Sequence, residues 1–237
     1  MSTIKENLKA VQSQIKKAAE AAGRNPAEIQ LIAVTKTHPP EMINEAIDCG
    51  VTDIGENKVQ EILEKYDHVK PVRWHLIGHL QTNKVKYIID KVSMIHSVDS
   101  IKLMDEIERQ AAKHNLCMDI LIQVNVSGEE SKFGIAPSEL DALLSHAEGL
   151  SHVRVCGLMT IMPKVDNNVT NTLHFVNINN IYIDIAKKKY HNITMRYLSA
   201  GMSGDYAFAI GYGANMVRVG SAIFGLRNYD IQGGLEK

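Results

Sequence analysis

Residues 29–40, IQLIAVTKTHPP, contain a short apolar run that reaches Lys36 and is stopped by two prolines. An apolar run bounded by turn residues is typical of a buried strand. Lys36 therefore lies at the carboxyl end of an expected strand, either as a solvated cap or as a buried amine kept for chemistry. Most lysines are solvated, so the position alone favours the cap.

The alternation of apolar strand and helical stretch recurs along the chain. An amphipathic helix precedes the first strand, because apolar residues recur every three or four positions from Ile4 to Ala19. Strand alternating with helix predicts right-handed crossovers and a parallel sheet. Strands are expected at residues 30–35, 53–55, 73–77, 94–98, 119–126, 154–160, 195–199 and 216–219. Helices are expected between them at 41–49, 58–66, 83–90, 101–114, 138–148 and 169–190.

Two α/β architectures contain such a sheet: an open doubly wound sheet and a closed (β/α)8 TIM barrel. No GxGxxG motif follows the first expected strand, which weakens the dinucleotide-binding form of the open sheet. About eight strands and eight helices in 237 residues match the barrel well. No linker, repeat or charge block divides the chain. We therefore expect one barrel domain over residues 1–237, with an extra N-terminal helix.

Composition excludes several kinds of partner. Lys and Arg total 26 against 27 Asp and Glu, so the net charge of -1 gives no overall attraction to nucleic acid or to an anionic membrane. No apolar run approaches the roughly 20 residues of a membrane span, and the N-terminal segment lacks the apolar core of a signal peptide. Three cysteines without a CxxC pair suit a reducing compartment. We expect a cytoplasmic protein.

In a barrel, functional residues lie at the carboxyl ends of the strands. Two of these places hold loops of small residues, SAGMSGD at 199–205 and RVGSAIFG at 218–225. Gly and Ser let backbone N–H groups and hydroxyls approach an anion, and a helix beginning at Ala222 would add a favourable dipole. Each loop alone is consistent with an ordinary glycine turn. Together, after the last two strands, they predict a phosphate site.

A lysine and a phosphate loop at one barrel mouth suit a phosphorylated aldehyde, of which pyridoxal 5′-phosphate (PLP) is an example. A desolvated lysine loses its proton more easily, and the neutral amine can form a Schiff base. Arg218, at the start of the second loop, is either a surface cation or a fixed cation beside a ring nitrogen or the phosphate. His75 and His79 do not form a helical metal pair, because His75 lies in a strand; we expect a structural role for them.

Seven ordered segments resemble the pyridoxal phosphate homeostasis proteins, a single-domain PLP-binding family, and together they cover nearly the whole chain. They are AVTK (33–36), IGENKVQE (54–61), WHLIGHLQTNK (74–84), VNVSGEESKFG (124–134), GLMTIMP (157–163), LSAGMSGDY (198–206) and VRVGSAIFG (217–225). The resemblance implies a PLP-binding barrel similar to the N-terminal domain of alanine racemase and other fold type III enzymes.

The resemblance also implies how the cofactor is held. Lys36 would carry PLP as a Schiff base, and Asn57 would lie near the cofactor mouth. Arg218 corresponds to the racemase-type arginine that faces the pyridine nitrogen and disfavours its protonation.

The phosphate would be held by Ser203, the backbone of Gly220 and Ser221, and the Ser221 hydroxyl. The family's usual pattern has Met at Ala200 and Thr at Ser221, so this chain departs from it twice. Ser221 keeps the hydroxyl, and the phosphate site is expected to survive.

Three functions compete. Family members are regarded as regulators of PLP supply without established turnover. This implies a non-catalytic carrier in PLP homeostasis, whose partners would be PLP and PLP-accepting apoenzymes. We expect a monomer, because the racemase dimer depends on a second domain. An amino acid racemase of the alanine racemase type is the alternative. Such enzymes carry a second, β-rich domain, and two-base racemisation needs an acid–base group on each face of the substrate, of which only Lys36 is evident. A class I aldolase is third and would be colourless, whereas a PLP protein is yellow.

Overall fold

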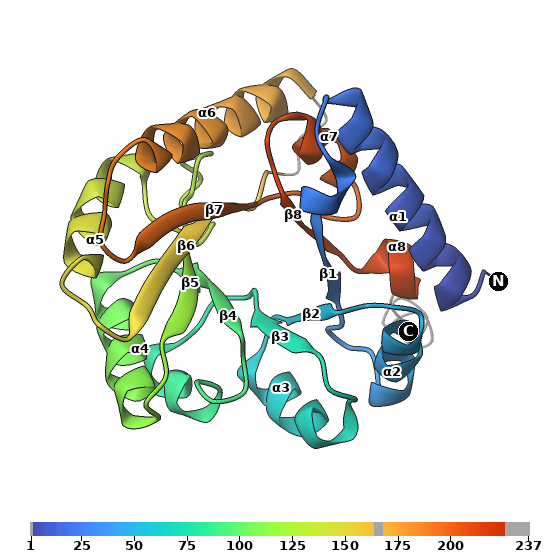
Figure 1. Ribbon diagram of the computed structural model, residues 1–237, viewed down its shortest axis with the longest axis horizontal. Helices are drawn as coiled ribbons and strands as arrows, with labels where there is room; N and C mark the ends of the chain where they lie inside the picture. Colours follow the sequence, from blue (N-terminus) through green and yellow to red (C-terminus); the bar gives the residue numbers. More distant parts are fainter. Residues whose placement is uncertain (1, 164–167, 226–237) are drawn as a thin grey trace, which may run out of the picture.

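The structure, a computed structural model, describes residues 2–163 and 168–225; the other residues of the expected 1–237 domain lie outside the described part. Eight parallel strands close into one barrel in chain order, because β8 pairs with β1 (Figure 1). This is the (β/α)8 barrel that the sequence predicted. The strands are β1 (Gln30–Val34), β2 (Asp53–Glu56), β3 (Arg73–Leu76), β4 (Met94–Val98), β5 (Met118–Gln123), β6 (Val153–Met159), β7 (Ile193–Ser199) and β8 (Met216–Val219).

Helices surround the barrel on the outside (Figure 1). The N-terminal helix α1 packs against α7, α8 and α2, and it begins at a capping box in which the Glu6 N–H donates to Thr3 Oγ1 at 3.2 Å. None of the helices within the described ranges is long and apolar enough to cross a membrane. The helices are α1 (Ile4–Ala21), α2 (Pro40–Asp48), α3 (Val59–Lys65), α4 (Ile101–Lys113), α5 (Leu140–Ala147), α6 (Asn168–Ala186), α7 (Tyr206–Gly211) and α8 (Ser221–Phe224), with 3-10 helices η1 (Pro26–Glu28), η2 (Tyr66–His68), η3 (Thr82–Tyr87) and η4 (Pro137–Glu139).

Several expected elements differ in the structure. Helix α6 ends at Ala186 rather than at residue 190, and α7 was not among the expected helices. The stretch expected as a helix at 83–90 is the 3-10 helix η3, in which backbone N–H groups reach three residues back, as from Lys84 to Gln81. Strand β5 ends at Gln123 rather than continuing to residue 126. The chain turns there because the Asn125 side-chain oxygen accepts hydrogen bonds from the Ser127 hydroxyl and the Gly128 N–H.

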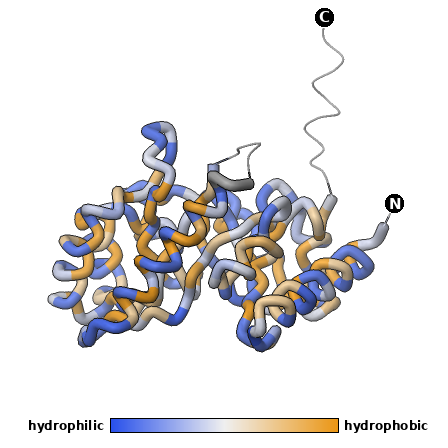
Figure 2. Tube along the Cα trace, turned by 90° about the horizontal axis from the view of Figure 1, so that it is seen from above, coloured by the Kyte–Doolittle hydropathy of each residue, from blue (hydrophilic) through white to orange (hydrophobic). Residues whose placement is uncertain are grey.

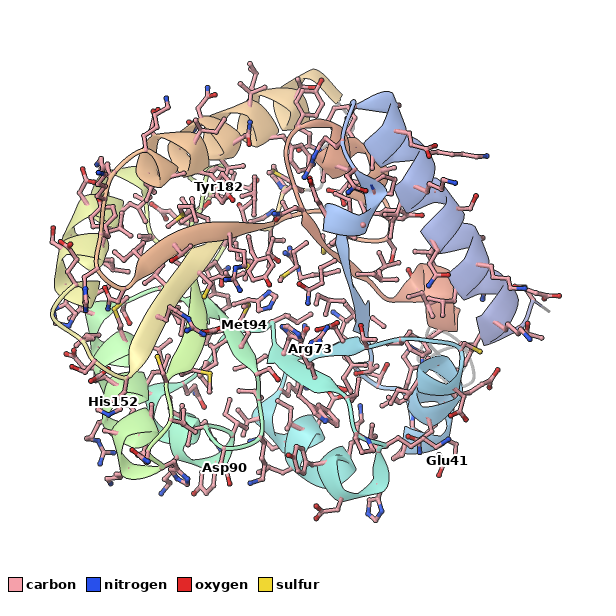
Figure 3. All side chains as sticks on the ribbon, viewed as in Figure 1. Glu41, Arg73, Asp90, Met94, His152 and Tyr182 are labelled. Atoms are coloured by element: carbon pink, nitrogen blue, oxygen red, sulfur yellow. The ribbon has the colours of Figure 1, made fainter. Side chains whose placement is uncertain are left out.

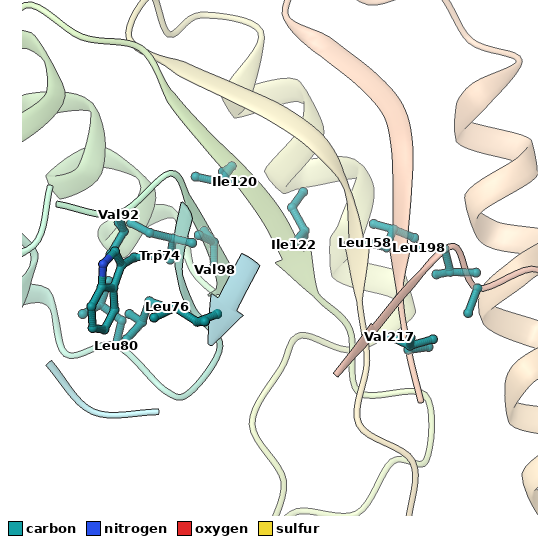
Figure 4. Close-up of a cluster of buried hydrophobic side chains, with 14 of the residues drawn as sticks. Trp74, Leu76, Leu80, Val92, Val98, Ile120, Ile122, Leu158, Leu198 and Val217 are labelled. Atoms are coloured by element: carbon teal, nitrogen blue, oxygen red, sulfur yellow. The ribbon is translucent and has the colours of Figure 1, made fainter. Parts of the chain in front are cut away.

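Strand side chains alternate between the barrel interior and the surrounding helices. The outer core lies between strands and helices, where Figure 4 shows side chains such as Trp74, Leu76 and Ile120. A smaller inner cluster fills the barrel with Ile32, Met94, Leu121, Cys156, Met159 and Met216.

The outer surface of the helices is largely polar. Hydrophobic and hydrophilic stretches alternate along the helices (Figure 2), and Glu41, Asp90 and His152 lie at the periphery (Figure 3). In β1, Ala33 belongs to the outer core and Ile32 to the inner cluster. Lys36 lies two residues beyond the end of β1, in the turn that follows it, and its side chain lines the cavity at the barrel mouth.

Candidate functional site

A cavity of about 480 Å³ opens at the carboxyl ends of the barrel strands, where functional sites of this fold lie. Its wall includes apolar side chains such as Val34 and Ile77. All six residues predicted to hold a cofactor line this cavity: Lys36, Asn57, Ser203, Arg218, Gly220 and Ser221. They come from the ends of β1, β2, β7 and β8, so closure of the barrel brings together positions that are far apart in sequence.

Lys36 is half-buried in the cavity wall, and the backbone on both sides of it is fixed by a buried ionic cluster. The Lys65 ammonium donates to the Thr35 carbonyl at 3.0 Å, to Glu56 Oε1 at 2.8 Å and to Glu61 Oε2 at 3.0 Å. On the other side, the Thr37 N–H donates to Glu61 Oε2 at 2.7 Å. The Thr35 hydroxyl completes the cluster with a bond to Glu56 Oε1 at 2.8 Å.

Thr37 has a φ of +67°, a backbone conformation that is an outlier for a β-branched residue. Its hydrogen bond to Glu61 is one interaction that holds this turn. Burial raises the pKa of Glu61, but the bonds from Thr37 and Lys65 outweigh it and lower that pKa overall. The charged form of Glu61 is therefore the one that fixes the turn after Lys36.

Glu56 is fully buried, and its Oε2 has no hydrogen-bond partner among the described residues. Burial raises the pKa of Glu56 to about 7, against the opposing effect of Lys65. The direction follows from the geometry, because one ammonium serves two carboxylates and Glu61 already takes part of its charge. Within the cluster beside Lys36, the Glu56 carboxyl is therefore the group that takes up or releases a proton near neutral pH.

The two loops of small residues meet across the cavity. Ser203 Oγ accepts a hydrogen bond from the Gly220 N–H at 3.1 Å, which joins the loop after β7 to the loop after β8. A Cβ at Gly220 would lie 3.2 Å from the Val34 side chain, so the small residue lets β8 pass close to β1. Helix α8 begins at Ser221 rather than Ala222 and is a single turn, so its dipole is much weaker than a long helix would provide.

Arg218 is a buried cation in the cavity wall, with 4% of its surface exposed. Its Nη1 donates to Ser199 Oγ at 2.5 Å and its Nη2 donates to the Thr160 carbonyl at 2.8 Å. Burial lowers the pKa of Arg218 to about 10, so the group remains charged at neutral pH. It forms no ion pair with a carboxylate among the described residues.

Asn57 is held by a close backbone approach. A Cβ placed on Gly78 would lie 2.3 Å from the Asn57 carbonyl oxygen, so only glycine fits at this contact between the ends of β2 and β3. Asn57 and Gly78 both line the cavity. The contact fixes the backbone that carries the Asn57 side chain.

Sequence reasoning did not identify the aromatic part of the cavity. The His79 ring stacks on Phe133 with centroids 4.1 Å apart, and its Nδ1 lies 3.5 Å from Asp99 Oδ2. His38, which also lines the cavity, stacks on Phe224 at 4.8 Å. These partners are distant in sequence. His79, Phe133 and Phe224 lie in three different quoted segments, so no local pattern showed that their rings would stack.

The donor set fits a phosphorylated pyridine aldehyde. An amine lies in the wall at Lys36, and a Ser–Gly loop that can hold an anion lies at Ser203 and Gly220. The guanidinium of Arg218 uses two of its five N–H donors on protein oxygens, which leaves donors for a ring nitrogen.

Comparison with known proteins identifies relatives over nearly the whole chain. The family described as alanine racemase, N-terminal domain, matches residues 7–228. The pyridoxal phosphate homeostasis protein of Aquifex aeolicus is 43% identical over 226 residues, 94% of this chain and 98% of that protein. The protein of the same name from Pseudomonas aeruginosa is 39% identical over 97% of this chain and 98% of its own length.

Solved structures give the same grouping. PipY of Synechococcus elongatus with PLP bound has a TM-score of 0.78 and 31% identity, covering 90% of this chain and all of that chain. An alanine racemase of Clostridium difficile has a TM-score of 0.73 at 14% identity, covering 96% of this chain and 58% of that chain, and shares the fold. The chain thus belongs to the family of pyridoxal phosphate homeostasis proteins, within the alanine racemase N-terminal domain family.

Proposed function

We propose that this protein binds pyridoxal 5′-phosphate in the cavity at the barrel mouth and serves in the intracellular supply of this cofactor. The observation that carries the proposal is the convergence of Lys36, the Ser203–Gly220 contact and Arg218 on one cavity. The names of the curated relatives and the PLP-bound structure of PipY support it. PLP-accepting apoenzymes would be its partners.

Each cavity residue has a distinct role in this proposal. PLP supplies an aldehyde that condenses with an amine, and Lys36 is the amine in the cavity wall. The hydroxyls of Ser203 and Ser221 and the backbone N–H of Ser221 hold the phosphate. The Gly220 N–H donates to Ser203 Oγ and leaves the Ser203 O–H to donate to the phosphate. Arg218 faces the ring nitrogen and, as a cation, keeps that nitrogen unprotonated.

Asn57 orients the cofactor at the cavity mouth. We propose that the protein acts as a monomer in the cytoplasm and has at most slow side activity. An unprotonated ring nitrogen is a weak electron sink, but the alanine racemase type has the same arginine, so this feature does not distinguish a carrier from a racemase.

Visible spectroscopy of wild type and two lysine variants tests the binding site. Wild type with added PLP should develop a yellow absorption band, and borohydride should fix the cofactor on Lys36, as located by peptide mass. Lys36→Ala should lose both signals. Lys70→Ala is the matched control, because Lys70 pairs with Asp48 on the exterior. A wild type that is colourless after unbound PLP is removed would contradict the proposal, and a band that persists in Lys36→Ala would reassign the lysine.

A racemase is the second candidate, and the position of His79 favours testing it. The cavity contains an imidazole beside Asp99, a second acid–base group that the sequence did not reveal. The matched part of the C. difficile alanine racemase is 58% of that chain. Turnover of about 1 s⁻¹ or more on an amino acid, abolished by His79→Ala, would establish the racemase over the carrier.

A further inference from the structure

A continuous chain of buried polar side chains crosses the barrel interior from its floor to the cavity. At the cavity end, Arg218 Nη1 donates to Ser199 Oγ, which lies 3.2 Å from His96 Nδ1. His96 Nε2 lies 3.0 Å from His75 Nδ1. His75 Nε2 lies 2.9 Å from Asp53 Oδ1, at the amino end of β2. None of the five residues has more than 4% of its surface exposed.

The floor end of the chain is anchored as an ionised carboxylate. Arg73 donates to Asp53 Oδ1 at 2.7 Å and to Oδ2 at 2.5 Å, and the Thr52 hydroxyl donates to Oδ2 at 2.7 Å. Burial raises the pKa of Asp53, but the hydrogen bonds from His75, Arg73 and Thr52 outweigh it and lower that pKa overall. A second cavity of about 430 Å³, lined by Asp53 and Arg73, opens at this end.

The chemistry of the two ends sets the direction of every hydrogen bond when both imidazoles are neutral. An ionised carboxylate only accepts, so Asp53 must receive the His75 Nε2–H. The unprotonated His75 Nδ1 then accepts from His96 Nε2–H, and His96 Nδ1 accepts from the Ser199 hydroxyl. Burial lowers the pKa of His96 well below its ordinary value, which favours its neutral form.

Donor and acceptor chemistry also shows that this series of hydrogen bonds cannot carry a proton into the cavity. A guanidinium has no acceptor, so a proton cannot pass through Arg218 to a molecule in the cavity. The chain instead ties one guanidinium nitrogen to Ser199, while Thr160 ties the other. In a close-packed barrel, two fixed bonds determine both the position and the tilt of the planar group.

We propose that His96 and His75 are positioning residues that hold Arg218 against the cofactor ring through Ser199, with Asp53 as the fixed terminus. This inference rests on the proposed function, because it assigns Arg218 to the ring of bound PLP. It predicts that removing His96, which is separated from the cavity by Ser199 and Arg218, changes the environment of the ring.

Nitrogen-15 NMR of the protein without cofactor tests the direction of the chain. His96 should be a neutral ring protonated at Nε2, with Nδ1 as an acceptor, and the two Nη signals of Arg218 should be resolved by slow rotation. A His96 ring protonated at Nδ1, or an imidazolium at neutral pH, would overturn the inference. This measurement needs neither PLP nor a variant.

Three variants then test positioning. His96→Leu removes the link, His96→Gln keeps an amide donor and acceptor, and His146→Leu is a matched control that removes a His–Asp bond on the exterior. We expect His96→Leu to average the Arg218 Nη signals, to weaken PLP binding about tenfold and to shift the absorption maximum of bound PLP. His96→Gln should restore most of each signal, and His146→Leu should change none.

The outcomes separate the two proposals. A folded His96→Leu variant with wild-type PLP affinity, absorption maximum and Arg218 signals would overturn the positioning role. If His96→Leu does not fold, the wild-type tautomer and the His96→Gln variant decide. If wild type takes up no PLP, the proposed function fails, and the positioning role toward the cofactor fails with it. The tautomer measurement would still determine the direction of the chain.

Discussion

The Lys65 ammonium lies 2.8 Å from Oε1 of the fully buried Glu56 and 3.0 Å from the carbonyl of Thr35, the residue before Lys36. The backbone next to Lys36, the amine proposed to bind the cofactor, is thus held by Lys65, whose ammonium donates to three protein oxygens. Lys36 and Lys65 have different roles because the Lys36 side chain lines the cavity, whereas the Lys65 ammonium binds the carboxylates of Glu56 and Glu61.

The first prediction concerns the pH dependence of stability. The folded-state pKa of Glu56 is raised to about 7 from an ordinary value of 4.5, so the folded state binds a proton that the unfolded state releases. The contribution of Glu56 is full below pH 4.5 and is lost as pH rises to about 7, with a total of up to about 3 kcal/mol. Urea denaturation from pH 4.5 to 8 measures it.

Glu56→Gln supplies the comparison, because the amide is neutral at every pH and still accepts from Lys65. Relative to this variant, wild type should lose stability as pH rises through this window. Glu64→Gln, at an exposed position of the same helix as Glu61, should follow the wild-type curve. Parallel curves for wild type and Glu56→Gln would contradict the raised pKa.

The second prediction concerns the strained turn after Lys36. Thr37 is exposed and has a φ of +67°, so Thr37→Gly removes strain of about 1–3 kcal/mol at an entropic cost of about 0.5–1 kcal/mol. We expect a net stabilisation of about 1 kcal/mol by thermal denaturation. Asn115, with a φ of +52°, is the matched control and should gain less on replacement by glycine, because Asn tolerates this conformation. An equal or larger gain at Asn115 would argue against strain at Thr37.

The third prediction separates phosphate binding from ring binding. Ser203→Ala removes the hydroxyl that contacts Gly220, so the affinity for PLP should fall about tenfold, the loss of one hydrogen bond to a charged group. Pyridoxal, which has no phosphate, should bind both proteins equally. Fluorescence titration measures both affinities, with the exposed Ser151→Ala as control. An equal loss for PLP and pyridoxal would remove Ser203 from the phosphate site.

The fourth prediction tests the close approach beside Asn57. Gly78→Ala would place a Cβ 2.3 Å from the Asn57 carbonyl oxygen, so the backbone must shift. We expect a loss of at least about 2 kcal/mol in the free energy of unfolding, together with weaker PLP binding. Gly211→Ala, with no atom within 4 Å of its Cβ, should be neutral or slightly stabilising. Comparable stability of the two variants would show that the contact relaxes freely.

Several features of the site could be predicted from local sequence. The apolar run before Lys36 predicted a strand that ends just before the lysine, but it did not decide between a solvated cap and an amine in the cavity. The small residues around Ser203 and Gly220 also marked their loops. Strand alternation and glycine chemistry are local properties, so a sequence determines them before any tertiary contact forms.

Other features were decided by the tertiary structure alone. The chain from Asp53 through His75 and His96 joins three neighbouring strands, and its bonds depend on the strand register and on which ring nitrogen faces which neighbour. The contact of Lys65 with Glu56 likewise requires α3 to fold back on β2. The sequence by itself determined where the amine and the anion loops lie, because strand period and turn chemistry are local. Barrel closure decided which buried polar groups satisfy one another, because side chains across strands meet only when the register is set.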